Sequence, residues 1–157
     1  MSEPAVVPVP ELDELPSAPA AELLRACCGS ARWVDAMVGR RPFHTLDVLL
    51  AEAEDAWWSL EPDDWLEAFA HHPRVGEGVA ATPQDARGPR GAANREYERR
   101  FGHIYIVCAT GKSAEEMLAI ARTRLANDAE VEVRVAAEEQ RKITRLRLEK
   151  LLTDETA

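Results

Sequence analysis

The feature that most constrains the fold is a long helical pattern at the C-terminal end of the chain. It begins at Asn127 or Asp128, either of which can cap a helix, and no glycine or proline interrupts it before about Leu152. Its apolar residues recur at helical spacing and are Val131, Val135, Ile143, Leu146, Leu148 and Leu151. The stretch predicts a single long final helix.

Cap and stop signals predict shorter helices upstream. Ser30 and Thr45 suit the N-cap position, Pro62 suits a first turn, and Ser113 with Glu116 forms a capping box. The predicted shorter helices cover about residues 20–28, 30–39, 45–57, 62–72, 96–101 and 113–125. Residues 74–90 are rich in glycine and proline and predict a loop.

Only residues 103–108 resemble a β-strand, because they are apolar and β-branched. No second strand is available to pair with them, so they are interpreted as an extended buried connector. The predicted fold is therefore all-α: a compact, single-domain bundle of roughly seven to eight helices. A chain of 157 residues that is 46% hydrophobic and 30% charged is enough for one such core.

The N-terminal residues differ in composition from the rest. Prolines are concentrated there, and the acidic stretch that follows adds no helical period. Residues 1–18 are therefore interpreted as a flexible proline-rich arm, and residues 19–153 as the helical domain.

The net charge of −9 would repel a phosphate backbone, which excludes DNA and RNA as partners, although a local group of arginines can still bind a small anion. The cysteines Cys27, Cys28 and Cys108 are odd in number and lack metal or disulfide spacing, which favours a reducing compartment. No apolar run approaches the roughly 20 residues that cross a bilayer. A cytoplasmic protein without membrane attachment is expected.

His72 is the strongest candidate for chemistry. It stands directly before Pro73, which keeps it out of the helical region and presents its ring at a helix end. Imidazole titrates near neutral pH and can exchange a proton during turnover. A histidine that only caps helix carbonyls is the alternative interpretation. The side chains of the adjacent residues His71 and His72 diverge on a helix, so they do not converge on one metal ion. The sequence also contains no histidines and carboxylates at the spacing of a metal site.

Several motifs in a fixed order resemble the 2-oxo-4-hydroxy-4-carboxy-5-ureidoimidazoline (OHCU) decarboxylase family. The motifs are His71 to Glu77 (HHPRVGE), Tyr97 to Gly102 (YERRFG), Gly111-Lys112 and Glu139 to Leu148 (EQRKITRLRL). The resemblance extends over about residues 19–152. It implies an all-α fold, commonly a homodimer, and the last step of urate breakdown, which yields (S)-allantoin without a cofactor.

The resemblance also implies roles for particular residues. His72 would be the acid/base group, and Pro73 would line the pocket beside it. The ring and ureido group would be cradled by Val107, Cys108, Ala109, Thr110 and Gly111. Arg147 would face the substrate, although Arg145 is close enough in sequence to be the matching arginine instead.

The loop after the His-Pro motif departs from the family pattern. The family carries a Ser-x-x-Glu-Gln sequence there, whereas residues 78–93 contain no Glu-Gln pair. Glu77 could take over the role of the glutamate, and Gln84 or Asp85 could supply a polar contact, or all three are ordinary loop residues. The departure leaves two alternatives to an OHCU decarboxylase: a non-catalytic helical dimer, or an enzyme for another small heterocyclic acid.

Tryptophans 57, 58 and 65 lie in a short span of the sequence. A domain of this size has difficulty burying all of them, so some are expected to line a dimer interface.

Overall fold

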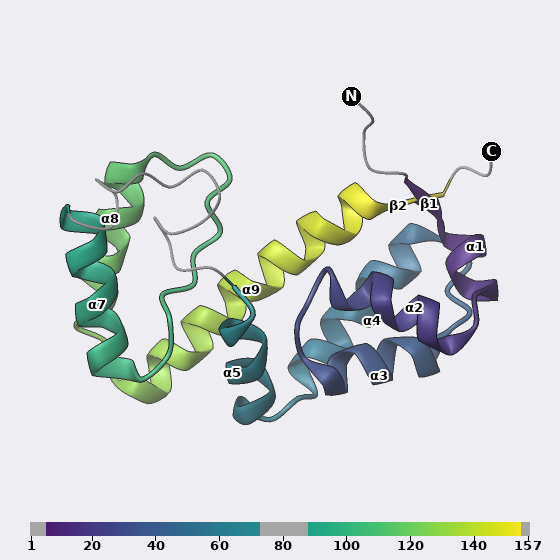
Figure 1. The fold of residues 1–157 in the computed structure, drawn as a ribbon, viewed down its shortest axis with the longest axis horizontal. Coiled ribbons are helices and arrows are strands. Elements are labelled where there is room, and N and C mark those ends of the chain that lie inside the picture. Colours follow the sequence, from purple (N-terminus) through teal and green to yellow (C-terminus); the bar gives the residue numbers. More distant parts are fainter. Residues whose placement is uncertain (1–5, 73–87, 155–157) are drawn as a thin grey trace. The chain divides into compact units, whose positions relative to one another are not determined.

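The structure is a computed structural model that describes residues 6–72 and 88–154 (Figure 1). Within these residues it contains eight helices and two short strands. The helices are α1 (Val9–Glu14), α2 (Ser17–Arg25), α3 (Ala31–Arg40), α4 (Leu46–Trp58), α5 (Pro62–Ala70), α7 (Pro89–Phe101), α8 (Ala114–Arg124) and α9 (Ala129–Leu151), and the strands are β1 (Val7–Pro8) and β2 (Leu152–Thr153). The predicted all-α fold is confirmed. The chain divides into two compact units, residues 1–67 with 141–157 and residues 68–140.

The first unit contains α2, α3 and α4, with α2 packed on α3 and α3 on α4 (Figure 1). The two predicted N-caps are confirmed: Ser30 Oγ accepts a hydrogen bond from Trp33 N, and Thr45 Oγ1 accepts one from Val48 N, each at 3.2 Å. Trp33 is fully buried, and its indole Nε1 donates to the carbonyl of Ala53 at 3.1 Å. This bond joins α3 to α4 through the core of the unit.

The sequence predicts no helix in the N-terminal arm, and that prediction is wrong. Helix α1 forms there and buries Val9 and Leu12 completely. Arg41, far along the chain, donates from Nη1 to the carbonyls of Leu12 at 2.9 Å and Leu15 at 2.6 Å. These carbonyls lie at the helix end, where backbone groups lack helical partners. A distant side chain therefore stabilises α1, which local sequence patterns do not reveal. The flexibility of the arm and its boundary at residue 18 stay a prediction.

The strands β1 and β2 run parallel, with Val7 beside Leu152 (Figure 1). The sequence predicts no sheet, and strands of two residues are too short to show an alternating pattern. The carboxylate of Asp154 accepts a hydrogen bond from the amide of Leu46 at 2.6 Å. Both contacts tie the C-terminal end of the first unit to its N-terminal helices.

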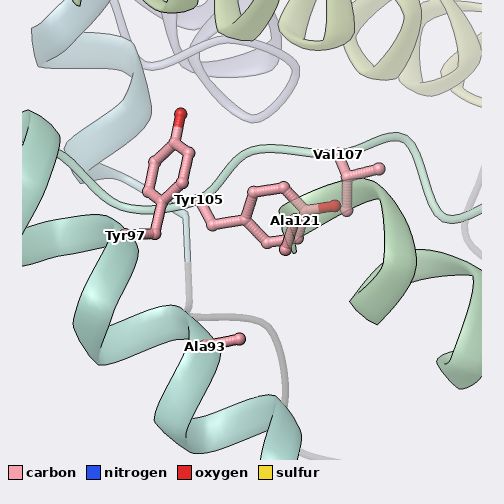
Figure 2. Close-up of a cluster of buried hydrophobic side chains, with 5 residues drawn as sticks. All are labelled: Ala93, Tyr97, Tyr105, Val107 and Ala121. Atoms are coloured by element: carbon pink, nitrogen blue, oxygen red, sulfur yellow. The ribbon is translucent and has the colours of Figure 1, made fainter. Parts of the chain in front are cut away.

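In the second unit, α7 packs beside α8, and an extended segment connects them in sequence (Figure 1). Gly102 ends α7 with φ at +79°, a left-handed conformation that favours glycine. Residues 105–108 of the extended segment are buried, which confirms the predicted connector. The core cluster in Figure 2 consists of Ala93, Tyr97, Tyr105, Val107 and Ala121. The segment is thus held between the two helices by apolar packing.

The boundaries of α7 and α8 test two local signals. The capping box of α8 is confirmed, because Glu116 N donates to Ser113 Oγ at 3.1 Å and Ser113 N donates to Glu116 Oε1 at 3.3 Å. Helix α7 begins at Pro89, earlier than the predicted Glu96. Proline suits the start of a helix, whereas the glycine- and proline-rich pattern places Pro89 in the predicted loop. Most of that loop lies outside the described residues.

Helix α9 begins where predicted, since the amide of Glu132 donates to the carbonyl of Asp128 at 2.8 Å. It has 23 residues, a length close to the roughly 20 that span a bilayer. Within the described stretches, however, no helix is both long and apolar enough to cross a membrane.

Candidate active site

His72 lies in the turn that ends α5. The amides of His71 and His72 donate to the carbonyls of Ala68 and Phe69 at 3.2 and 3.1 Å. Both bonds span three residues, a tighter turn than the α-helix, as expected where a following proline prevents its continuation. His71 is exposed, whereas His72 is half-buried. Pro73, predicted to line the pocket, lies outside the described residues.

The imidazole of His72 contacts α9 through Gln140. His72 Nε2 lies 2.5 Å from Gln140 Oε1, and Gln140 is completely buried. Because an amide oxygen only accepts hydrogen bonds, the ring donates an Nε2–H to it. A side chain on another helix therefore orients the ring, which differs from the carbonyl-capping role considered as the alternative.

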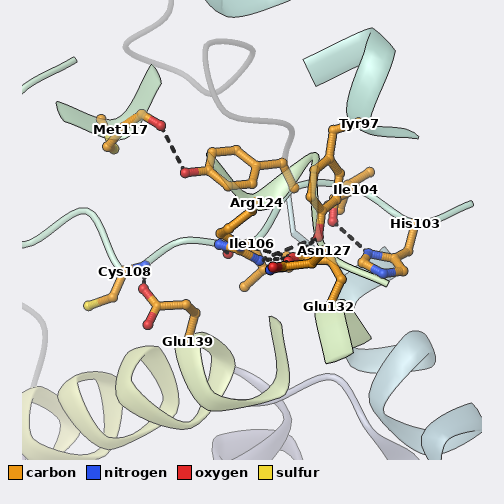
Figure 3. Close-up of polar contacts among 11 residues, drawn as sticks. Tyr97, His103, Ile104, Ile106, Cys108, Met117, Arg124, Asn127, Glu132 and Glu139 are labelled. Carbon is orange, nitrogen blue, oxygen red and sulfur yellow. Dashed lines mark hydrogen bonds and ion pairs between the residues drawn. The ribbon is translucent and has the colours of Figure 1, made fainter. Parts of the chain in front are cut away.

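The segment predicted to cradle the substrate is anchored at Cys108 and exposed after it. Glu139 Oε1 accepts a hydrogen bond from Cys108 N at 3.0 Å (Figure 3). Lys112 Nζ donates to the Cys108 carbonyl at 3.1 Å. Val107 and Cys108 are buried. The exposed residues of the segment are Ala109, Thr110 and Gly111. Since the backbone of Cys108 is engaged within the protein, the exposed turn is the part that can meet a ligand directly.

Glu139 and Gln140 are consecutive residues of α9, and each holds a different part of the predicted site. Gln140 contacts His72, and Glu139 contacts the backbone of Cys108. One turn of α9 therefore holds both predicted parts of the site that lie in the second unit.

A buried ion pair anchors the same segment at Ile106. Arg124 of α8 and Glu132 of α9 are 5% and 0% exposed, and Arg124 Nε lies 2.8 Å from Glu132 Oε2 (Figure 3). Arg124 Nη1 donates to the carbonyl of Ile106 at 2.7 Å. The hydroxyl of Tyr97 donates to the same carboxylate. Burial and this hydrogen bond raise the pKa of Tyr97. The network fixes the backbone of the segment directly before Val107.

Arg147 and Arg145 have different surroundings within the first unit. Arg147 is half-buried, with Nη1 at 3.5 Å from the carbonyl of Cys27. The side chain of Arg145 is 46% exposed and lies 3.8 Å from Glu149. Burial raises the pKa of the Cys27 thiol to about 12 and that of Cys28 to about 11, while the nearby Arg147 guanidinium lowers both. Arg147 is thus the arginine that packs among buried groups.

Metal ligands do not gather in the part of the chain that the structure describes. No group of three or more His, Cys, Asp or Glu side chains among residues 6–72 and 88–154 could hold a metal ion. Cys108 is a free thiol that is only 6% exposed. Such burial is typical of a cysteine that packs as a small apolar group and not of a nucleophile.

The family model described as OHCU decarboxylase matches residues 13–91 and 91–149 of this chain. The chain belongs to the OHCU decarboxylase family. A crystal structure of an OHCU decarboxylase determined in the presence of (S)-allantoin is similar, with a TM-score of 0.77 and 35% identity over 83% of this chain and 96% of that chain. An (S)-allantoin synthase shares the fold, with a TM-score of 0.73 and 24% identity over 93% of this chain and 54% of that chain.

Two longer relatives of this chain are named for uric acid degradation. The bifunctional protein TTL of Arabidopsis thaliana is 32% identical over 83% of this chain. The bifunctional protein of Bacillus sp. (strain TB-90) is 21% identical over 92% of this chain. This chain covers 46% of the first and 32% of the second, so it spans less than half of each. The OHCU decarboxylase of Amia calva is 37% identical over 38% of this chain and 34% of its own length.

Four polar residues of the site region were not predicted from the sequence: Arg124, Glu132, Glu139 and Gln140. Gln140 contacts His72, Glu139 and Arg124 contact the segment, and Glu132 holds Arg124. A signal for two of them was available, because Glu132 and Gln140 flank the buried Ala136 at intervals of four residues. That spacing places polar residues on the inner face of α9.

Proposed function

We propose that this chain catalyses the cofactor-independent decarboxylation of OHCU to (S)-allantoin in urate breakdown, with His72 as the acid/base group. The observation that carries the proposal is the placement of His72. His72 lies half-buried in the turn that ends α5, and the buried Gln140 orients its ring. The chain that carries this arrangement belongs to the OHCU decarboxylase family. The similar OHCU decarboxylase was crystallised in the presence of (S)-allantoin, which supports the same product.

The proposed reaction needs few groups from the protein. The departing carboxylate sits on a carbon next to a C=N bond. When the carbon–carboxylate bond breaks, CO2 leaves and the electron pair passes into the ring. One proton is then added to carbon, so the net reaction consumes one proton. The substrate acts as its own electron sink, which leaves the protein to orient the carboxylate, exclude water and deliver a proton to one face.

His72 is the proposed proton donor, and it regains its proton from water after each turnover. The exposed turn of residues 109–111, together with Val107 and Cys108, is the proposed cradle for the ring and ureido group. Arg147 is the proposed partner of the substrate carboxylate, for which the planar guanidinium is well suited. Its contact with buried groups supports Arg147 over the more exposed Arg145. Pro73 is proposed to line the pocket beside His72.

A homodimer in the cytoplasm is also proposed. Trp57 and Trp65 are buried at 3% and 4%, but Trp58 is 40% exposed, which supports it as an interface residue. The free thiols of Cys27, Cys28 and Cys108 support a reducing compartment.

The loop residues that could take the place of the missing family motif, Glu77, Gln84 and Asp85, lie outside the described residues. The absence of the Ser-x-x-Glu-Gln motif from this chain keeps two other functions in view. A non-catalytic dimer would retain the fold without turnover, and an altered enzyme would act on another heterocyclic acid.

Conversion of freshly generated OHCU, followed by circular dichroism, tests the proposal. Spontaneous decay of OHCU gives racemic allantoin, so a catalysed reaction is recognised by an excess of the (S)-enantiomer formed faster than in buffer. Racemic product at the buffer rate, in the presence of folded protein, would overturn the proposed function and favour one of the two alternatives.

A further inference from the structure

Gln140 is a polar side chain on the inner face of α9, near the small apolar residues Ala136 and Ala137. Gln140, Ala136 and Ala137 are each 0% exposed. A buried amide costs free energy unless it is hydrogen-bonded. The oxygen of this amide lies 2.5 Å from His72 Nε2, so the buried glutamine contacts the ring to which we assign the chemistry.

We infer that Gln140 is a positioning residue that holds the neutral imidazole of His72 in its Nε2–H tautomer, with Nδ1 as the nitrogen that exchanges protons with the substrate. The inference rests on the function proposed above. A neutral imidazole carries one proton, and an oxygen acceptor at Nε2 requires that proton to be there. The basic lone pair of the neutral ring then belongs to Nδ1, which takes up a proton from water. The protonated ring passes this Nδ1–H to the substrate carbon, and the neutral Nε2–H tautomer is left behind.

The chemical nature of Gln140 suits this role. Its amide does not titrate, so the ring is held in one orientation at every pH at which the protein is folded. A proton donor that must add its proton to one face of a carbon needs one fixed nitrogen and one ring orientation. A buried neutral acceptor supplies both without adding a charge beside the substrate.

The neighbouring residue provides a matched control. Glu139 precedes Gln140 on α9, but its carboxylate holds the Cys108 amide and not the imidazole. Glu139→Gln therefore changes the same turn of the helix without changing the acceptor at His72 Nε2. Gln140→Met removes that acceptor at similar side-chain size, and Gln140→Glu retains an oxygen acceptor.

Long-range proton–nitrogen correlation spectra of the imidazole-labelled protein, recorded where His72 is neutral, test the inference. The parent, Glu139→Gln and Gln140→Glu should show a proton on Nε2 and none on Nδ1. Gln140→Met should show both tautomers, while the signals of exposed His71 stay unchanged. With OHCU as substrate, Gln140→Met should lower kcat by about 10- to 100-fold with little change in KM.

Two spectroscopic results would overturn the inference: a parent ring protonated at Nδ1, or a Gln140→Met ring that keeps the parent tautomer. The parent spectrum alone can do so, even where the methionine variant fails to fold. These spectra need no turnover. Failure of the parent to convert OHCU would instead overturn the proposed function, so the two failures are distinguishable.

Discussion

Removing the negative charge of Glu132 should destabilise the protein far more than removing an exposed carboxylate from the same helix. Glu132 is 0% exposed and holds the guanidinium of Arg124, which is itself only 5% exposed. In Glu132→Gln the cation stays buried beside a neutral partner. Arg124 also donates to the carbonyl of Ile106, so it cannot leave the core without breaking that bond.

The size of the effect follows from the burial of the pair. Leaving one charge of a buried ion pair without its partner costs about 3–5 kcal/mol, a large part of the roughly 5–15 kcal/mol that stabilises a domain. The pair Arg145–Glu149 on the same helix is a matched control, because its side chains are 46% and 41% exposed and 3.8 Å apart. An exposed pair contributes less than about 1 kcal/mol, and this sets the expected effect of Glu149→Gln.

Urea unfolding followed by far-ultraviolet circular dichroism measures both variants against the parent. Glu132→Gln should lose about 3–5 kcal/mol in the free energy of unfolding, and Glu149→Gln less than about 1 kcal/mol. If Glu132→Gln does not fold, the double variant Arg124→Met/Glu132→Leu should recover folding, because it removes both charges. A loss below about 1 kcal/mol for Glu132→Gln would refute the reasoning.

Three further predictions concern pH, assembly and the loop. Burial raises the pKa of Tyr105 from 10 to about 12 and also raises the pKa of Tyr97, so the free energy of unfolding should fall as pH rises above about 10. An ultraviolet titration in which the tyrosines of the native protein show ordinary pKa values would contradict this. Sedimentation at micromolar concentration should show a parent dimer that Trp58→Glu weakens, and a monomeric parent would exclude the dimer. The missing loop glutamate should cost about 2–4 kcal/mol of transition-state stabilisation, or about 30- to 1000-fold in rate. If Glu77 has taken its place, Glu77→Gln should abolish the remaining OHCU turnover; full activity in both parent and variant would show that the contact is not needed.

Local signals in the sequence predicted the starts of α3, α4 and α8 correctly. Ser30, Thr45 and Ser113 each cap a helix through their own side chain and the amide three residues later. Such bonds depend only on nearby residues, so the sequence pattern contains the information. The buried connector was predicted for a similar reason, since its apolar run has no partner strand.

Interactions between distant residues could not be predicted in the same way. Helix α1 depends on Arg41, and the orientation of His72 depends on Gln140, which is 68 positions away in sequence. Polar residues on a helix are ordinarily taken to face solvent, yet Glu132 and Gln140 are buried because the partners that satisfy them come from other elements. The predicted site therefore contained the group assigned to chemistry and lacked the groups that hold it in place.

The proposed chemistry depends most directly on His72, and one comparison of variants tests this role. Rates of (S)-allantoin formation from OHCU should be measured for His72→Ala and His71→Ala, with folding of both verified by circular dichroism. Loss of a general acid/base group lowers turnover by about 10²–10⁴-fold, and this is the result expected for His72→Ala. His71 is the adjacent, exposed histidine, so His71→Ala should have far less effect. Equal and small effects of the two substitutions would contradict the assignment of His72 as the acid/base group.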